Sequence, residues 1–131
     1  MSAEDTQDEV FRAAQAAYQQ GDLARAASLC AEVLATHPDY AAASYLLGVL
    51  ALGNGDPKAA LNHFSTAIRN SPQSANYYHA LAVACYQAGD LQNAEQNLRC
   101  AIGLLPGQVD VRLKLAGLLR EQGRAMDALK E

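Results

Sequence analysis

Residues 44–72 read SYLLGVLALGNGDPKAALNHFSTAIRNSP, and they contain one complete unit of a helical pattern. An apolar helical pattern runs into Gly55, begins again after Asp56 and stops before Pro72. Gly55 can take the left-handed conformation that ends a helix, Asp56 can cap the free amides of the next helix, and Pro57 suits its first turn. The stretch therefore predicts two antiparallel helices joined by a tight turn.

The same turn and helix-end residues recur along the whole chain at a spacing of 34 residues. The recurring residues are Gly21, Gly55, Gly89 and Gly123, Pro38, Pro72 and Pro106, and Ala26, Ala60, Ala94 and Ala128. A period of this length is typical of solenoids, in which each helical hairpin buries its apolar face against its neighbours. Thr6 and Glu9 have the spacing of a capping box, so we expect an N-terminal tail over residues 1–6 and a first helix from residue 7.

In this register the chain resembles the tetratricopeptide repeat, whose pattern calls for a small residue late in the first helix, Gly at the turn, Ala early in the second helix and Pro at the end. The second repeat fits best, with Leu47, Gly48, Gly55, Ala60, Phe64, Ala67 and Pro72. The resemblance covers residues 7–131. It implies an all-α, right-handed superhelical solenoid of antiparallel helical hairpins, with full repeats at 7–40, 41–74 and 75–108 and an incomplete fourth at 109–131.

Small residues also recur where the two helices of a hairpin must approach each other closely. Ala14, Gly48, Ala82 and Ala116 on the first helices are expected to face Ala26, Ala60, Ala94 and Ala128 on the second helices. A bulky side chain at these positions would push the helices apart.

The composition narrows the function classes. The net charge is −4 and the ten basic residues are scattered, which argues against a nucleic-acid partner. The apolar stretch over residues 40–52 is too short to span a bilayer, and the N-terminal MSAEDTQDEV is acidic where a signal peptide would be basic. We therefore expect a cytoplasmic protein with no membrane partner.

The three cysteines have no metal-binding or redox spacing, which suits a reducing compartment. Cys30 and Cys85 fall on core-facing positions, and Cys100 is expected to be exposed.

The first helices of stacked hairpins in this family line the concave face, and residues four and three apart form one stripe on them. The predicted groove consists of Phe11, Gln15, Tyr18, Tyr45, Leu46, Val49, Leu52, Asn76, His79, Val83, Tyr86 and Leu113. No charged residue occurs in 40–55 or 70–89. Tyr18, Tyr45 and Tyr86 are expected to be exposed in the groove. Val49, Leu52 and Val83 could equally well be buried by packing between neighbouring first helices.

These residues predict a protein-interaction scaffold that holds a peptide or helix of a partner protein by apolar contacts. The family members that grip chaperone tails need Lys, Asn and Arg on the groove floor. Here those positions hold Phe11, Gln15, Leu46, Asn76 and Ala80, so that carboxylate clamp is not expected.

Catalysis, cofactors and metals are not expected. His37, His63 and His79 lack metal-binding spacing from one another and from the cysteines, and the sequence has no phosphate-binding loop or nucleophile elbow. The chain is therefore not expected to be an enzyme.

Two alternatives remain open. No polar capping helix follows the fourth repeat to cover Leu115, Leu118 and Leu119, so the chain could form homo-oligomers through its C-terminal end or be a fragment of a longer protein. Similar Ala-rich repeats precede glycosyltransferase or sulfotransferase domains in bacterial proteins, so it could also be a substrate-recruiting arm of such an enzyme.

Overall fold

The described part of the chain is all helical, as the sequence predicts. The computed structural model describes residues 3–107 and 109–121, with side chains for residues 6–107, 111–118 and 120. The helices in this part are α1 (Ala3–Gln19), α2 (Leu23–Thr36), α3 (Ala41–Gly53), α4 (Pro57–Asn70), α5 (Ala75–Gln87), α6 (Leu91–Leu104) and α7 (Val109–Glu121).

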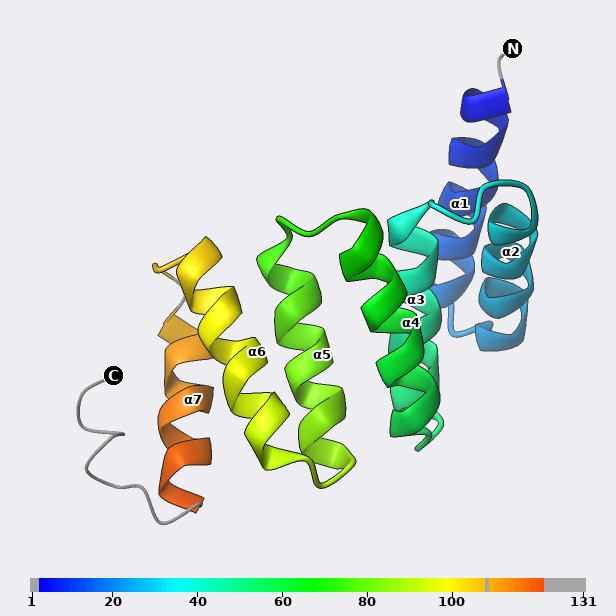
Figure 1. Ribbon diagram of the computed structural model, residues 1–131. Coiled ribbons are helices and arrows are strands. Elements are labelled where there is room, and N and C mark those ends of the chain that lie inside the picture. Colours follow the sequence, from blue (N-terminus) through cyan, green and yellow to red (C-terminus); the bar gives the residue numbers. More distant parts are fainter. Residues whose placement is uncertain (1–2, 108, 122–131) are drawn as a thin grey trace. The chain divides into compact units, whose positions relative to one another are not determined.

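The helices form two compact units, Met1–Ser71 and Pro72–Glu131. In the first unit α1 pairs with α2, α3 pairs with α4, and α2 packs against α3 (Figure 1). In the second unit α5 pairs with α6, and α7 packs against α6. Three helical hairpins and the first helix of a fourth repeat are therefore present, which confirms the expected fold class.

Each described hairpin turn has the predicted left-handed glycine followed by an aspartate that caps the next helix. The backbone φ angle is positive at the turn glycines, with Gly21 at +83°, Gly55 at +76° and Gly89 at +85°. The aspartate after each glycine accepts a hydrogen bond from the backbone N–H three residues on: Asp22 from Arg25 at 3.2 Å, Asp56 from Ala59 at 3.1 Å and Asp90 from Asn93 at 3.2 Å. The fourth turn, at Gly123, lies outside the described residues.

The first helix begins earlier than expected. It starts at Ala3, so Thr6 lies within α1 and the expectation that the helix begins at residue 7 is wrong. Residues 3–6 contain no glycine or proline, and nothing in their sequence ends a helix. The capping-box spacing of Thr6 and Glu9 is thus an interior helical spacing.

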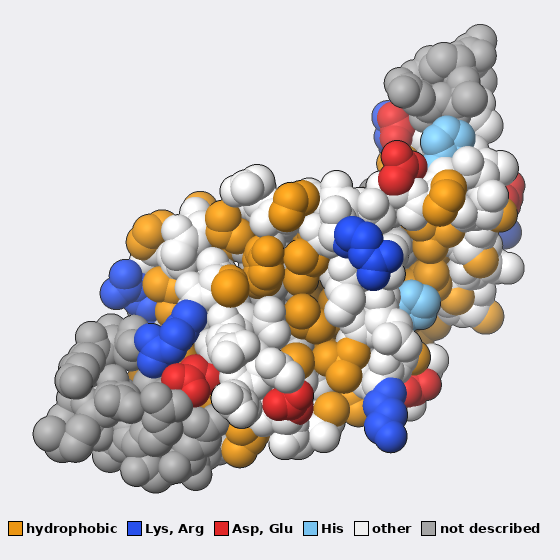
Figure 2. Space-filling view, in the orientation of Figure 1, with side chains coloured by type: hydrophobic (Ala, Val, Ile, Leu, Met, Phe, Trp, Pro, Cys, Tyr) orange, Lys and Arg blue, Asp and Glu red, His pale blue; other side chains and the backbone are white. Residues whose placement is uncertain are grey.

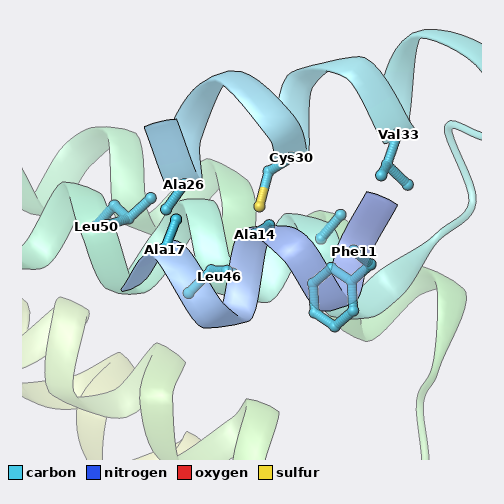
Figure 3. Close-up of a cluster of buried hydrophobic side chains, with 9 residues drawn as sticks. Phe11, Ala14, Ala17, Ala26, Cys30, Val33, Leu46 and Leu50 are labelled. Carbon is cyan, nitrogen blue, oxygen red and sulfur yellow. The ribbon is translucent and has the colours of Figure 1, made fainter. Parts of the chain in front are cut away.

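The core of the first unit is built largely from small residues. Ala14, Ala26 and Cys30 are fully buried where α1 meets α2 (Figure 3). At the end of this cluster the rings of Phe11 and Tyr40 lie 5.3 Å apart. The small residues allow α1 and α2 to approach each other closely, as expected from the repeat pattern. The paired position Ala128 of the fourth repeat lies outside the described residues.

Helix α7 buries residues that were expected to be uncovered. Leu115 and Leu118 are both buried, so the expectation that they form an open apolar end is wrong. Residues three apart lie on the same face of a helix, and α7 packs this face within the second unit. The side chain of Leu119 lies outside the described residues, and the exposed leucine of α7 is Leu113, at 65%.

Candidate functional site

The first unit contains a hollow between α1 and α3, here called the first hollow. Its volume is about 330 Å³, and its lining is Phe11, Gln15, Tyr18, Gln19, Ala42, Tyr45, Leu46 and Val49. All the predicted groove residues of the first two repeats except Leu52 meet here. Leu52 is half-buried and lies off the lining. Gln19 and Ala42 also line the hollow, although they lie beside the predicted stripe.

The wall of the first hollow is aromatic and its floor belongs to the core. Tyr18 is 40% exposed, whereas Phe11 and Leu46 are buried in the cluster shown in Figure 3. Tyr45 is half-buried rather than exposed, and its ring lies 5.7 Å from that of Phe64. Burial, and then the neighbouring phenol of Tyr18, raise the pKa of Tyr45 above its ordinary value. Tyr45 is therefore fixed by packing, whereas Tyr18 beside it is open to solvent.

The second unit contains a hollow of similar size, here called the second hollow. Its volume is about 330 Å³, and its lining is Ala82, Val83, Tyr86, Ala94, Leu98, Lys114, Gly117 and Leu118. Val83 and Tyr86, both predicted groove residues, lie here. Asn76 and Leu113 are exposed and lie off the lining.

Helix α5 supplies an uncharged wall to this second hollow. Its sequence from Ala75 to Gln87 contains no Asp, Glu, Lys or Arg. Hydrophobic and uncharged side chains cover α5 on the face seen in Figure 2. The cation on the lining, Lys114, comes from α7.

Lys114 is hydrogen-bonded to a predicted groove residue. Its Nζ lies 2.8 Å from Nε2 of His79 on α5. Because an ammonium group has only donors, the lysine donates and Nε2 accepts, which leaves the ring proton of the neutral imidazole on Nδ1. His79 therefore lies at the rim of the second hollow and is connected to it through Lys114.

The two hollows occupy equivalent positions of the repeat. Tyr18 of the first hollow and Tyr86 of the second lie two repeats apart in register, and their exposed fractions are 40% and 46%. Because the two hollows are lined by equivalent repeat positions, a single stripe of residues on the first helices predicted part of the lining of each hollow. Two equivalent positions differ strongly in size or charge: Leu46 corresponds to Lys114, and Val49 corresponds to Gly117.

No group of three or more His, Cys, Asp or Glu side chains in the described part of the chain could hold a metal ion. Within residues 3–107 and 109–121, every helix is too short or too polar to cross a membrane.

Comparison with known proteins decides the family. A family model of the tetratricopeptide repeat matches residues 17–85, which is more than half of the chain. The chain belongs to the tetratricopeptide repeat family. No curated protein matches this family member in sequence.

Several solved structures share the fold of this tetratricopeptide repeat chain. A MamA fragment from Desulfovibrio magneticus RS-1 is 22% identical with a TM-score of 0.86, over 95% of this chain and 70% of that one. Another MamA crystal structure is 22% identical with a TM-score of 0.88, over 97% and 69%. A mutant O-GlcNAc transferase from Thermobaculum terrenum is 25% identical with a TM-score of 0.82, over 91% of this chain but 23% of that one. These likenesses support a helical-repeat solenoid fold.

Proposed function

We propose that this tetratricopeptide repeat chain is a protein-interaction scaffold that binds a peptide or helix of a partner protein through the predicted groove. The observation that carries the proposal is the first hollow, where Tyr18 and Tyr45 stand over a floor formed by Phe11 and Leu46. Tyrosine combines a large apolar area with a polar tip and is enriched among the residues that dominate binding energy at interfaces.

The size and polarity of the first hollow define the kind of contact. A volume of about 330 Å³ lies at the lower end of ligand-pocket volumes, so the hollow accommodates one or two side chains of a partner. Its lining includes two amide side chains, Gln15 and Gln19, and no charged residue. An apolar or aromatic anchor with nearby backbone hydrogen-bonding groups suits this surface.

Self-assembly through the C-terminal end is not favoured by the described residues. Leu115 and Leu118, the side chains that this alternative requires, are buried within the second unit.

The test begins with random peptides displayed on phage and selected on the full chain. A selected peptide is then synthesised, and its affinity is measured by fluorescence anisotropy for the wild type and for Tyr18→Ala. Tyr18 is exposed and lines the hollow, so its truncation is expected to weaken binding about tenfold or more without unfolding the chain. The matched control is Leu23→Ala, an exposed apolar residue of the same unit that lies outside the hollow. Tyr86→Ala is the same test for the second hollow, since Tyr86 is 46% exposed on its lining. Equal affinities for the wild type, Tyr18→Ala and Tyr86→Ala would contradict the proposal.

A further inference from the structure

The second hollow is deepened by a missing side chain. Gly117 occupies the repeat position that Val49 and Val83 fill elsewhere, and a Cβ added to Gly117 would meet no atom within 4 Å. Glycine in a helix interior costs about 1 kcal/mol relative to alanine. The chain thus carries an unfavourable residue at a point where a side chain would fit, and the result is open space on the lining of the hollow.

The interior of this space is apolar. Leu98 and Leu118 are buried on its lining, together with the small Ala82 and Ala94, and Tyr86 forms a wall that is 46% exposed. No carboxylate belongs to the lining. An aliphatic side chain of a partner would therefore gain apolar contacts here and leave no buried polar group without a hydrogen bond.

The rim of the second hollow is cationic in a chain whose net charge is −4. Lys114 is exposed and lies on the lining, with His79 as a hydrogen-bonding neighbour at 2.8 Å. On α6 the buried Glu95 is occupied by an ion pair with Arg99 at 3.3 Å. An ammonium group beside an apolar hollow, without a carboxylate on the same lining, is electrostatically complementary to an acidic partner.

We infer that the second hollow binds a segment of a partner protein in which an aliphatic side chain stands next to Asp or Glu. The aliphatic side chain fills the space over Gly117, and the carboxylate pairs with Lys114. This inference rests on the proposed function and adds the chemistry of the partner to it. It also assigns Gly117 and Lys114 as residues that determine specificity, because the equivalent Val49 and Leu46 of the first hollow are larger or uncharged.

The carboxylate is that of a side chain rather than a chain terminus. Terminal carboxylates are commonly captured by backbone N–H groups in a nest. Every residue on the lining lies within α5, α6 or α7, where backbone N–H groups are used inside the helices. A single lysine ammonium can meet one carboxylate of an internal Asp or Glu.

The first arm of the experiment tests the apolar anchor. Displayed peptides are selected on the wild type, and one peptide that carries the enriched sequence is synthesised with an amidated C-terminus. Gly117→Val fills the open space and is expected to weaken its binding about tenfold or more. Gly103→Val is the matched control, since a Cβ at Gly103 also meets no atom within 4 Å and that residue lies outside both hollows. Gly117→Ala is a second, milder variant that favours the helix, and circular dichroism checks that each variant is folded.

The second arm tests the charge. Lys114→Gln is expected to weaken binding of the same amidated peptide about two- to fivefold, the size of an exposed ion pair. The loss should shrink as the salt concentration rises. Lys58→Gln removes the same charge from an exposed position on α4 and should leave the affinity unchanged.

The outcomes separate this inference from the proposed function. If peptides selected on the wild type bind more weakly to Tyr18→Ala but equally well to Gly117→Val and Lys114→Gln, the inference is wrong and the proposed function stands. If no peptide is enriched, both are wrong. If the peptide binds only when its C-terminal carboxylate is free, the inference is wrong, because the acidic group is then a chain terminus and not an Asp or Glu side chain. If the wild type is a dimer by light scattering and Gly117→Val is a monomer, a second copy fills the hollow and the inference is wrong.

Discussion

The ring of Phe64 lies where a side chain of residue 48 would be. A Cβ added to Gly48 would lie 2.5 Å from Cδ1 and 2.9 Å from Cζ of Phe64, and Phe64 is fully buried. The equivalent pairs are Ala14 with Cys30 in the first repeat and Ala82 with Leu98 in the third. Among these three pairs, Phe64 is the largest residue on a second helix, and it faces Gly48, the smallest residue on a first helix.

We expect Gly48→Ala to destabilise the chain although alanine is the better helix former. The gain in helix propensity is about 1 kcal/mol, whereas overpacking a buried ring typically costs about 1–3 kcal/mol. Urea unfolding should therefore give a lower midpoint with an unchanged slope. Combining Gly48→Ala with Phe64→Leu, which reproduces the third-repeat pair, should cost less than the sum of the two single changes. A higher midpoint for Gly48→Ala alone would contradict the packing argument.

Loss of a turn aspartate should destabilise the hairpin that it caps. Asp56 accepts a hydrogen bond from the N–H of Ala59 at the start of α4, and replacing such a cap by alanine costs about 0.5–2 kcal/mol. Asp56→Ala is thus expected to lower the melting temperature measured by circular dichroism. Asp39→Ala, at an exposed position between helices, is the control with the same change of charge. An equal melting temperature for Asp56→Ala and the wild type would show that the cap contributes little.

The three thiols should differ sharply in reactivity. Burial raises the pKa of Cys30 to about 11 and also raises that of Cys85, and both side chains are buried, whereas Cys100 is exposed. The thiolate is the reactive form, so Ellman's reagent at neutral pH should modify one thiol rapidly and all three only after unfolding in urea. Cys100→Ser should remove the rapid phase. Rapid modification that persists in this variant would mean that a buried thiol becomes accessible in the folded chain.

The sequence predicts most accurately what depends on neighbouring residues. The turns at Gly21, Gly55 and Gly89 are confirmed because the positive φ and the aspartate cap are set within a few residues. The contact between His79 and Lys114 could not be predicted in this way, since it depends on how α5 and α7 lie in space. The open space above Gly117 is likewise a property of the packed unit and is not visible in the sequence.

A second contact between residues far apart in the sequence was also beyond local signals. Asp8 lies on α1, and it would lie on a helix that began at residue 7 as well. From that position Asp8 accepts a hydrogen bond from the hydroxyl of Tyr40 at 2.6 Å, across 32 residues of sequence. Helix α1 is thus hydrogen-bonded to the residue that precedes α3, a contact that periodicity alone does not reveal.

We expect Tyr40→Phe to destabilise the chain by about 1–2 kcal/mol. The substitution keeps the ring that packs against Phe11 but removes the donor to Asp8. Hydrogen bonds to charged groups contribute about 1.5–3 kcal/mol, and this bond is only partly buried, so the lower part of that range applies. Asp8→Ala removes the acceptor, and the double variant completes a thermodynamic cycle followed by urea unfolding. A coupling free energy near zero would show that the two side chains act independently. A coupling of about 1 kcal/mol would show that their hydrogen bond stabilises the position of α1 relative to the N-cap of α3.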